Sequence, residues 1–207
     1  MIYRLLAIAV AAALAPATMA AQQHGTLEFL GAGTYTWTAP TGATVLGVEM
    51  WGAGGGGTQR SSSQRSGNGG GSGAYVRTVL TVVPGQTYYI QVGAGGAGDT
   101  GSGMGAAGQP TQIVDSSSAV LMYAGGGGGA SKITNTGGPG GLPHPSAGVK
   151  RNGRAGGVST GVGGNMGGTA IVGTIERPYS MDGGAGASYR SVGAGSAGGP
   201  GYAIITW

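Results

Sequence analysis

The sequence predicts an all-β protein: an antiparallel β-sandwich with an attached bundle of glycine-rich segments in a polyproline II or polyglycine II conformation. Short apolar stretches alternate in hydrophobicity, as strands with one buried face do. Glycine accounts for 51 of the 207 residues, which opposes α-helix, and no window has a 3.6-residue apolar period. The glycine lies in blocks between the strands. Little or no α-helix is therefore expected in the mature chain.

The first 20 residues are typical of a secretory signal peptide. Arg4 supplies a positive charge, residues 5–14 are an unbroken apolar run, and small residues around Ala20 suit cleavage. The alternative is a membrane anchor, but the run is shorter than the ~20 residues that a spanning helix needs. We expect a secreted or cell-surface protein, with a signal at residues 1–20, one domain at 21–207 and no transmembrane segment after cleavage.

Strands can be placed along the mature chain in order. Residues 34–38 alternate, so that Tyr35 and Trp37 share one face. In residues 45–51 the side chains of Leu46, Val48 and Met50 share a face. Further strands are expected at residues 75–83, 87–92, 111–114, 119–124 and 202–207.

The connections carry ordinary loop and turn signals. Pro84-Gly85 is typical of a type II turn, which predicts a hairpin of residues 75–83 and 87–92. Residues 22–30 form a short lead-in before the first strand, loose enough to pair with a neighbouring copy. Residues 58–72 are polar and predict an exposed loop.

The glycine blocks require their own explanation. Polyproline II segments turn every three residues and form no internal hydrogen bonds, so their backbone groups must bond to neighbouring segments. Side chains would hold those neighbours apart, and glycine does not. Gly93 and Gly96 share a three-residue phase, as do Gly195, Gly198 and Gly201. A packed bundle is favoured, and irregular glycine loops are the alternative.

Several motifs together resemble the glycine-rich domain of phage tail-fibre proteins and secreted bacterial proteins. The motifs are Tyr35-Thr36-Trp37 with Pro40, the run from Val48 to Gly57, Pro84-Gly85, Val92-Gly93-Ala94-Gly95-Gly96, and the run from Gly199 to Trp207. The resemblance covers residues 26–207. It implies a β-sandwich with glycine-rich helices, used for attachment or as a structural module. The chain departs from the phage case in its secretion signal and in lacking a fibre shaft.

No constellation in the sequence indicates an enzyme, a cofactor or a metal. Residues 93–98 match the dinucleotide-binding spacing, but no helix follows to face a pyrophosphate. Asp99 after Gly-Ala-Gly is close to a calcium-binding repeat, although it comes one residue early and the ordinary alternative is turn chemistry. His24 and His144 have no ligand cluster nearby in the sequence. The net charge of +4 is too weak to argue for nucleic acid.

Candidate surface-binding residues are basic or aromatic and lie in polar stretches. They are Arg60, Arg65, Lys150, Arg151, Arg154 and Tyr179. The basic residues could meet an anionic surface polymer, and the alternative is solvated loop charge that maintains solubility. Tyr123 and Tyr189 either contact a partner or wedge between sheet and bundle.

The sequence favours a secreted, non-enzymatic structural or adhesive protein. Its polar loops, expected at residues 58–72, 132–154 and 175–182, would attach it to a cell-surface or extracellular polymer. One alternative is self-assembly of copies of the chain into an extracellular filament or matrix. A weaker alternative is binding of ice or polysaccharide by a flat face that carries threonines.

Overall fold

The computed structural model describes residues 24–59, 66–143, 148–158, 167–168 and 194–207. The predicted signal peptide, and the loop expected at 175–182, lie outside these ranges. Within them the chain contains no helix, and its strands are β1 (Thr26–Phe29), β2 (Gly33–Thr38), β3 (Val45–Trp51), β4 (Tyr75–Thr81), β5 (Thr87–Val92), β6 (Thr111–Asp115), β7 (Val120–Ala124), β8 (Val149–Arg151) and β9 (Tyr202–Thr206).

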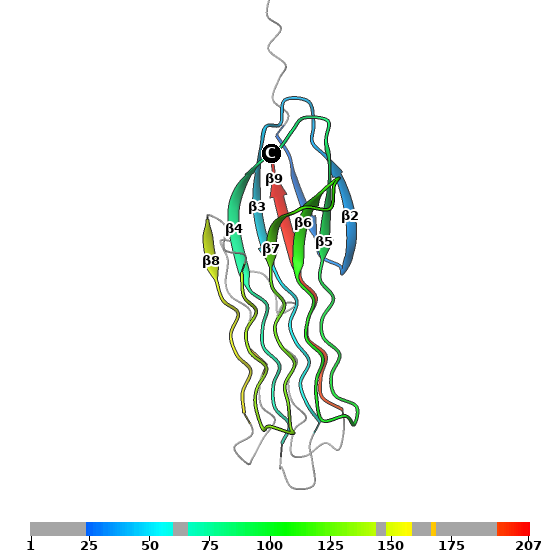
Figure 1. Ribbon diagram of the computed structural model, residues 1–207, viewed down its shortest axis with the longest axis vertical. Helices are drawn as coiled ribbons and strands as arrows, with labels where there is room; N and C mark the ends of the chain where they lie inside the picture. The colour runs from blue at the N-terminus through cyan, green and yellow to red at the C-terminus, as the bar shows by residue number, and fades with distance from the viewer. Residues whose placement is uncertain (1–23, 60–65, 144–147, 159–166, 169–193) are drawn as a thin grey trace, which may run out of the picture.

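The strands form two antiparallel sheets that pack face to face, which confirms the predicted sandwich (Figure 1). One sheet has the order β1-β9-β3-β4-β8 and the other β2-β5-β6-β7. The core between them contains the predicted faces of β3 and β5, together with Trp37 of β2 and Met122 of β7. Leu46 and Ile90 are fully buried there. Burial of each such side chain contributes about 1.5–3 kcal/mol.

The predicted hairpin of β4 and β5 is wrong. The turn itself forms, because the Gln86 N–H donates to the Val83 carbonyl at 3.0 Å and Gly85 has a φ of 81°. The two strands then enter different sheets, β4 beside β3 and β5 beside β2. Each strand buries its apolar face in the same core from opposite sides, which a hairpin within one sheet would not achieve.

Two further strands differ from the expectation. The lead-in is not loose: β1 pairs with β9, with Leu27 opposite Ile205. β8 was not predicted and forms the other edge of the five-stranded sheet, with Arg151 opposite Tyr75. The stretch 132–154 is therefore not one loop, since it contains a glycine segment and this edge strand.

Below the sandwich, extended glycine-rich segments run side by side (Figure 1). We call these the glycine bundle; its main described segments are 52–58, 66–74, 93–98, 105–110, 125–130, 137–143, 152–158 and 194–201. They have neither helix nor strand structure, and they bond to one another through their backbones. Such bonding between segments is what polyproline II chains require.

Segment 52–58 shows the periodicity of the glycine bundle most clearly. Its N–H groups donate in turn to three different neighbours at 2.8–3.1 Å: Gly52, Gly55 and Thr58 to segment 66–74, Ala53 and Gly56 to residues 109 and 106, and Gly54 and Gly57 to residues 199 and 196. Each neighbour receives a bond from every third residue. This is the three-residue turn of a polyglycine II helix.

The glycine phases predicted from the sequence are confirmed by direct pairing. The N–H groups of Gly195, Gly198 and Gly201 donate to the carbonyls of Asp99, Gly96 and Gly93 at 2.9–3.0 Å. The two phases therefore mark one pair of antiparallel segments, with Asp99 as the last residue in register. In these segments the packed bundle is present and irregular loops are not.

Glycine is required because the segments approach too closely for side chains. A Cβ at Gly55 would overlap the carbonyl of Gly128, and one at Gly56 would overlap that of Ala97. The predicted exposed loop at 58–72 is also wrong for its described residues, because Thr58, Asn68 and Ser72 are buried. Their polar groups bond within the bundle: for example, the Arg154 N–H donates to the Ser72 hydroxyl at 2.9 Å.

An aromatic cluster lies where the strands pass into the glycine bundle. Trp51, at the end of β3, packs against Tyr75 and Tyr202 with ring centroids 5.0 and 5.4 Å apart. The Tyr75 hydroxyl donates to Glu49 at 2.8 Å. This cluster is on the outer face of the five-stranded sheet, opposite the sandwich core, and it fixes the three strands that continue into adjacent glycine segments.

Candidate functional site

The glycine bundle ends in turns at the pole of the molecule opposite the C-terminus (Figure 1). We call this end the tip; in the described chain it comprises residues 58–59, 66–68, 99–104, 131–136 and 158. The turn at 99–104 connects two glycine segments, and the turn at 131–136 connects two others. The two turns touch, because the Lys132 N–H donates to the Gly103 carbonyl at 2.9 Å.

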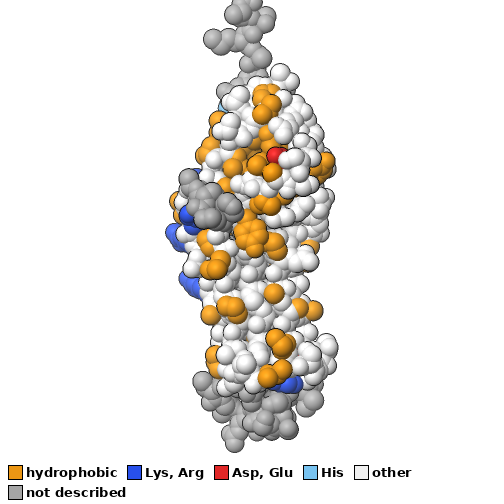
Figure 2. Space-filling model, viewed as in Figure 1, with side chains coloured by type: hydrophobic (Ala, Val, Ile, Leu, Met, Phe, Trp, Pro, Cys, Tyr) orange, Lys and Arg blue, Asp and Glu red, His pale blue; other side chains and the backbone are white. Residues whose placement is uncertain are grey.

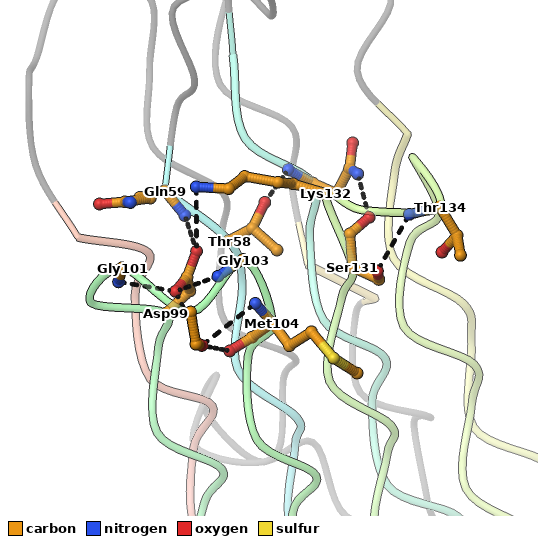
Figure 3. A network of polar contacts seen from close by, with 11 residues as sticks. Thr58, Gln59, Asp99, Gly101, Gly103, Met104, Ser131, Lys132 and Thr134 are labelled. Atoms are coloured by element: carbon orange, nitrogen blue, oxygen red, sulfur yellow. Dashed lines mark hydrogen bonds and ion pairs between the residues drawn. The ribbon is translucent and has the colours of Figure 1, made fainter.

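Asp99 organises the first turn (Figure 3). It is only 1% exposed, and Oδ1 accepts from the N–H groups of Gly101 and Gly103 at 2.8 and 2.9 Å. The Ser102 hydroxyl also donates to Oδ1, and the Gln59 N–H donates to Oδ2 at 3.4 Å. The carboxylate thereby closes its own turn and joins it to the segment that contains Gln59.

The charge of Asp99 is held by these contacts. Burial raises the pKa of Asp99, but the hydrogen bonds from its turn and from Gln59 outweigh burial, so the pKa of this carboxyl lies below its ordinary value. The Lys132 ammonium lies 3.8 Å from Oδ2. Asp99 thus remains a carboxylate at neutral pH and ties the two turns together electrostatically.

Asn68 joins the second turn to the glycine bundle from inside. Its Nδ2 donates to the Ser131 carbonyl at 2.7 Å and to the Asn135 side chain at 3.3 Å. Its backbone N–H donates to the Thr58 hydroxyl at 2.8 Å, and its carbonyl accepts from the Thr58 N–H. Residues 58 and 68 are therefore linked to each other and to the second turn, so the described tip is a connected surface.

The described part of the tip presents mainly apolar and uncharged polar side chains at its surface, beside the partly exposed Lys132. Ile133, Met104 and Val158 have exposed fractions of 71%, 56% and 42%. Thr134 and Asn135 lie beside them and are exposed. Large exposed apolar side chains held on a rigid support are typical of contact surfaces.

Replacing Asp99 by asparagine should destabilise the chain by about 1–3 kcal/mol, because an amide group cannot accept all of the buried hydrogen bonds. Since the folded-state pKa is depressed, the Asp99 contribution is complete above about pH 4 and is lost as the pH falls through that lower value. Urea unfolding at pH 7 and pH 3 measures both effects.

Asp115→Asn is the matched control for Asp99→Asn. Asp115 also accepts from its own turn, at Ser117 and Ala119, but it does so at the surface, where water replaces a lost bond. We expect a smaller loss for this variant. Equal losses at pH 7 would contradict a special role for Asp99.

The proposed surface residues that the structure describes, Lys150, Arg151, Arg154 and Tyr123, do not lie at the tip. Arg60, Arg65, Tyr179 and Tyr189 lie outside the described residues. Lys150 and Arg151 are on β8, and Arg154 lies in the glycine segment 152–158 that follows it; all three are exposed on one flank. Figure 2 shows blue side chains on the side of the molecule where Figure 1 places β8. Tyr123, on β7, is half-buried where the sheet meets the bundle.

The cofactor-like motifs have structural roles in the described chain. In residues 93–98, the Gly96 N–H donates to the Gly54 carbonyl and the Gly93 N–H to the Thr111 hydroxyl, and the segment ends in a turn instead of a helix. The Asp99 oxygens are engaged by that turn, by Gln59 and by Lys132. No group of three or more His, Cys, Asp or Glu side chains comes together in the part that the structure describes.

The tip network was missed by reasoning from the sequence, apart from the turn chemistry of Asp99. Asp99-Thr-Gly-Ser-Gly has the composition of a turn in which a carboxylate caps following N–H groups, and this local signal was available. Asn68, which bonds to the second turn, and Lys132, which pairs with Asp99, come from distant segments, and no local pattern in the sequence indicates these contacts.

Comparison with known proteins identifies the domain. A family model described as a glycine-rich domain matches residues 30–207. No curated protein matches the chain. Among the described residues, no helix is long and apolar enough to cross a membrane.

Proposed function

The chain belongs to the glycine-rich domain family, and on this premise we propose that it is a secreted, non-enzymatic adhesive protein. Its tip binds a cell-surface or extracellular polymer, while the sandwich forms the rigid base. The observation that carries this proposal is the cross-linked tip, where Asp99 and Asn68 hold two turns together beneath exposed Met104 and Ile133.

The glycine bundle supports an adhesive role because it separates the tip from the sandwich. At about 3.1 Å per residue, segment 52–58 places the tip about 20 Å beyond the end of β3. Backbone bonds in three directions make this spacer stiff, so that little freedom remains to be lost on binding. Because the spacer already positions the turns at its end, these turns are held in place by the contacts between them. A spacer with a preorganised end suits attachment better than catalysis.

Met104→Glu combined with Ile133→Glu should weaken attachment by at least about tenfold, because a contact surface that loses its apolar anchors and gains two charges must pay for desolvating them. Binding of the purified full chain to whole cells, measured over a concentration series, tests this expectation. The folded state should be unaffected, since both side chains are exposed.

Two controls separate the tip from other surfaces. Val83→Glu introduces one glutamate, against two in the tip variant, at a position as exposed as Met104 in the turn between β4 and β5, away from the tip. Arg151→Glu with Arg154→Glu tests the basic flank. Loss of binding on the flank variant with none on the tip variant would overturn the tip proposal in favour of electrostatic attachment through the flank.

A further inference from the structure

A groove crosses the outer face of the four-stranded sheet where it meets the glycine bundle. It has a volume of about 630 Å³, within the roughly 300–1,000 Å³ typical of ligand sites. Strands β2, β5 and β6 supply its floor, and residues 93–94 and 109–110 of the glycine bundle supply its lower wall. It lies on the sandwich, so inferences about it do not rest on the function proposed for the tip.

A row of polar side chains crosses the groove. Thr34 lies opposite Gln91, and Gln91 lies opposite Gln112, on three adjacent strands. All three side chains point outward, because their neighbours Tyr35, Ile90 and Ile113 point into the core. Gln109 adds a fourth polar side chain from the glycine segment that leads into β6. Adjacent strands are about 4.8 Å apart, which sets a regular spacing for the row.

The pairing of the glutamines leaves complementary groups open to a ligand. The Gln112 Nε2 donates to the Gln91 Oε1 at 2.6 Å. This leaves the Gln91 amide nitrogen and the Gln112 amide oxygen without a partner in the described chain. If both amides were flipped, a nitrogen and an oxygen would still remain, so the groove presents a neighbouring donor and acceptor in either case. The Gln109 side-chain oxygen accepts from the Ala94 N–H at 3.4 Å, so its amide nitrogen remains available as a donor to a ligand.

The rest of the lining excludes ionic ligands and favours sugars. None of the residues that line the groove is charged, so an ion would lose hydration without gaining a counter-charge. The lining also includes the apolar residues Ala32, Ala94 and Pro110. A pyranose ring has apolar C–H faces and hydroxyls that both donate and accept. We propose that this groove is a binding site for an uncharged glycan.

A peptide fits the same lining less well. An extended peptide satisfies its backbone by adding to the edge of a sheet, and here that edge is β2. The open amide groups of Gln91 and Gln112 instead lie across the middle of the sheet face, on β5 and β6.

The test is calorimetric titration of the full chain with soluble dextran, mannan, galactan and chitin oligosaccharides, with polygalacturonate as the acidic comparison. Binding of a neutral glycan is expected, and Gln112→Glu should weaken it at least tenfold by placing an unpaired charge in the groove. Thr36→Glu is the matched control, since Thr36 is exposed on the same face but does not line the groove. It should leave the affinity unchanged.

Several outcomes would overturn the inference: no binding by any of the neutral glycans, equal binding of polygalacturonate, binding of an extended peptide alone, or equal loss in both glutamate variants. Thermal unfolding of each variant shows whether the fold is intact. If Gln112→Glu unfolds the chain, Thr34→Ala with Gln109→Ala serves instead, against Thr36→Ala. Met104→Glu with Ile133→Glu should leave glycan titrations unchanged, so failure of the tip proposal and failure of this inference are distinguishable.

Discussion

Replacing Gly55 by alanine should destabilise the folded chain by about 3 kcal/mol or more, the upper range for an overpacked interior. Gly55 lies in the central segment of the glycine bundle, and its N–H donates to Gly71 at 2.8 Å. A methyl group there would overlap the carbonyl of Gly128. Because that obstacle is backbone, relief requires one segment to move away from another, which breaks hydrogen bonds worth about 1 kcal/mol each.

Denaturant unfolding of purified protein measures this effect, and soluble yield gives a first indication. Gly31→Ala is the matched control, because the same added methyl group meets only the Tyr35 hydroxyl at 3.2 Å, and that side chain can shift. The control should change stability by less than about 1 kcal/mol. Similar behaviour of the two variants would show that the glycine bundle tolerates side chains and that close packing is not the reason for its glycine.

Replacing Trp51 by alanine should cost about 3–5 kcal/mol, as large-to-small changes of buried aromatic residues do. Trp51 is 1% exposed and packs with tilted rings against Tyr75 and Tyr202 at the point where three strands join glycine segments. Its loss leaves a cavity at this junction. We expect thermal unfolding to remain a single transition at lower temperature, because these three strands connect the sandwich covalently to the glycine bundle.

Trp207→Ala provides the comparison for Trp51→Ala. Trp207 also packs against an aromatic ring, Trp37, at 5.5 Å, but it is only partly buried at the other end of the sandwich. A smaller loss is expected. Two separate transitions in Trp51→Ala would mean that the glycine bundle folds independently of the sheets, contrary to this expectation.

Local patterns were sufficient to predict most of the sandwich. The alternation in residues 34–38 and 45–51 reports which face is buried, and the structure places Trp37 and Leu46 in the core accordingly. Pairing was less predictable: Pro84-Gly85 identifies a turn but contains no information on which sheet each strand joins. The edge strand β8 has only three residues, all exposed, and thus lacks an apolar face to detect.

The glycine bundle and the tip illustrate the same limit. The three-residue phase of Gly195, Gly198 and Gly201 is visible in the sequence because every turn of the helix repeats the same environment. Asn68 has no such repetition, and its contacts with Ser131 are formed across 63 positions of sequence. The basic side chains of Lys150 and Arg151 are evident from the sequence alone. The described tip is instead held together by buried polar groups, whose partners the sequence does not reveal.

The three-residue repeat of hydrogen bonds in the glycine bundle restricts how such a domain can change over evolution. Inserting one residue into segment 52–58 would rotate everything beyond it by a third of a turn, so that each later N–H would face a different neighbour from the one to which it now donates. Lengthening is tolerated only in steps of three residues, about 9 Å, and in neighbouring segments together. The turns at the tip lie outside this repeat of hydrogen bonds, so their length can change by any number of residues. Relatives should therefore differ freely in the turns while the bundle keeps its register, which makes the tip suitable for exchange of binding sequences by design.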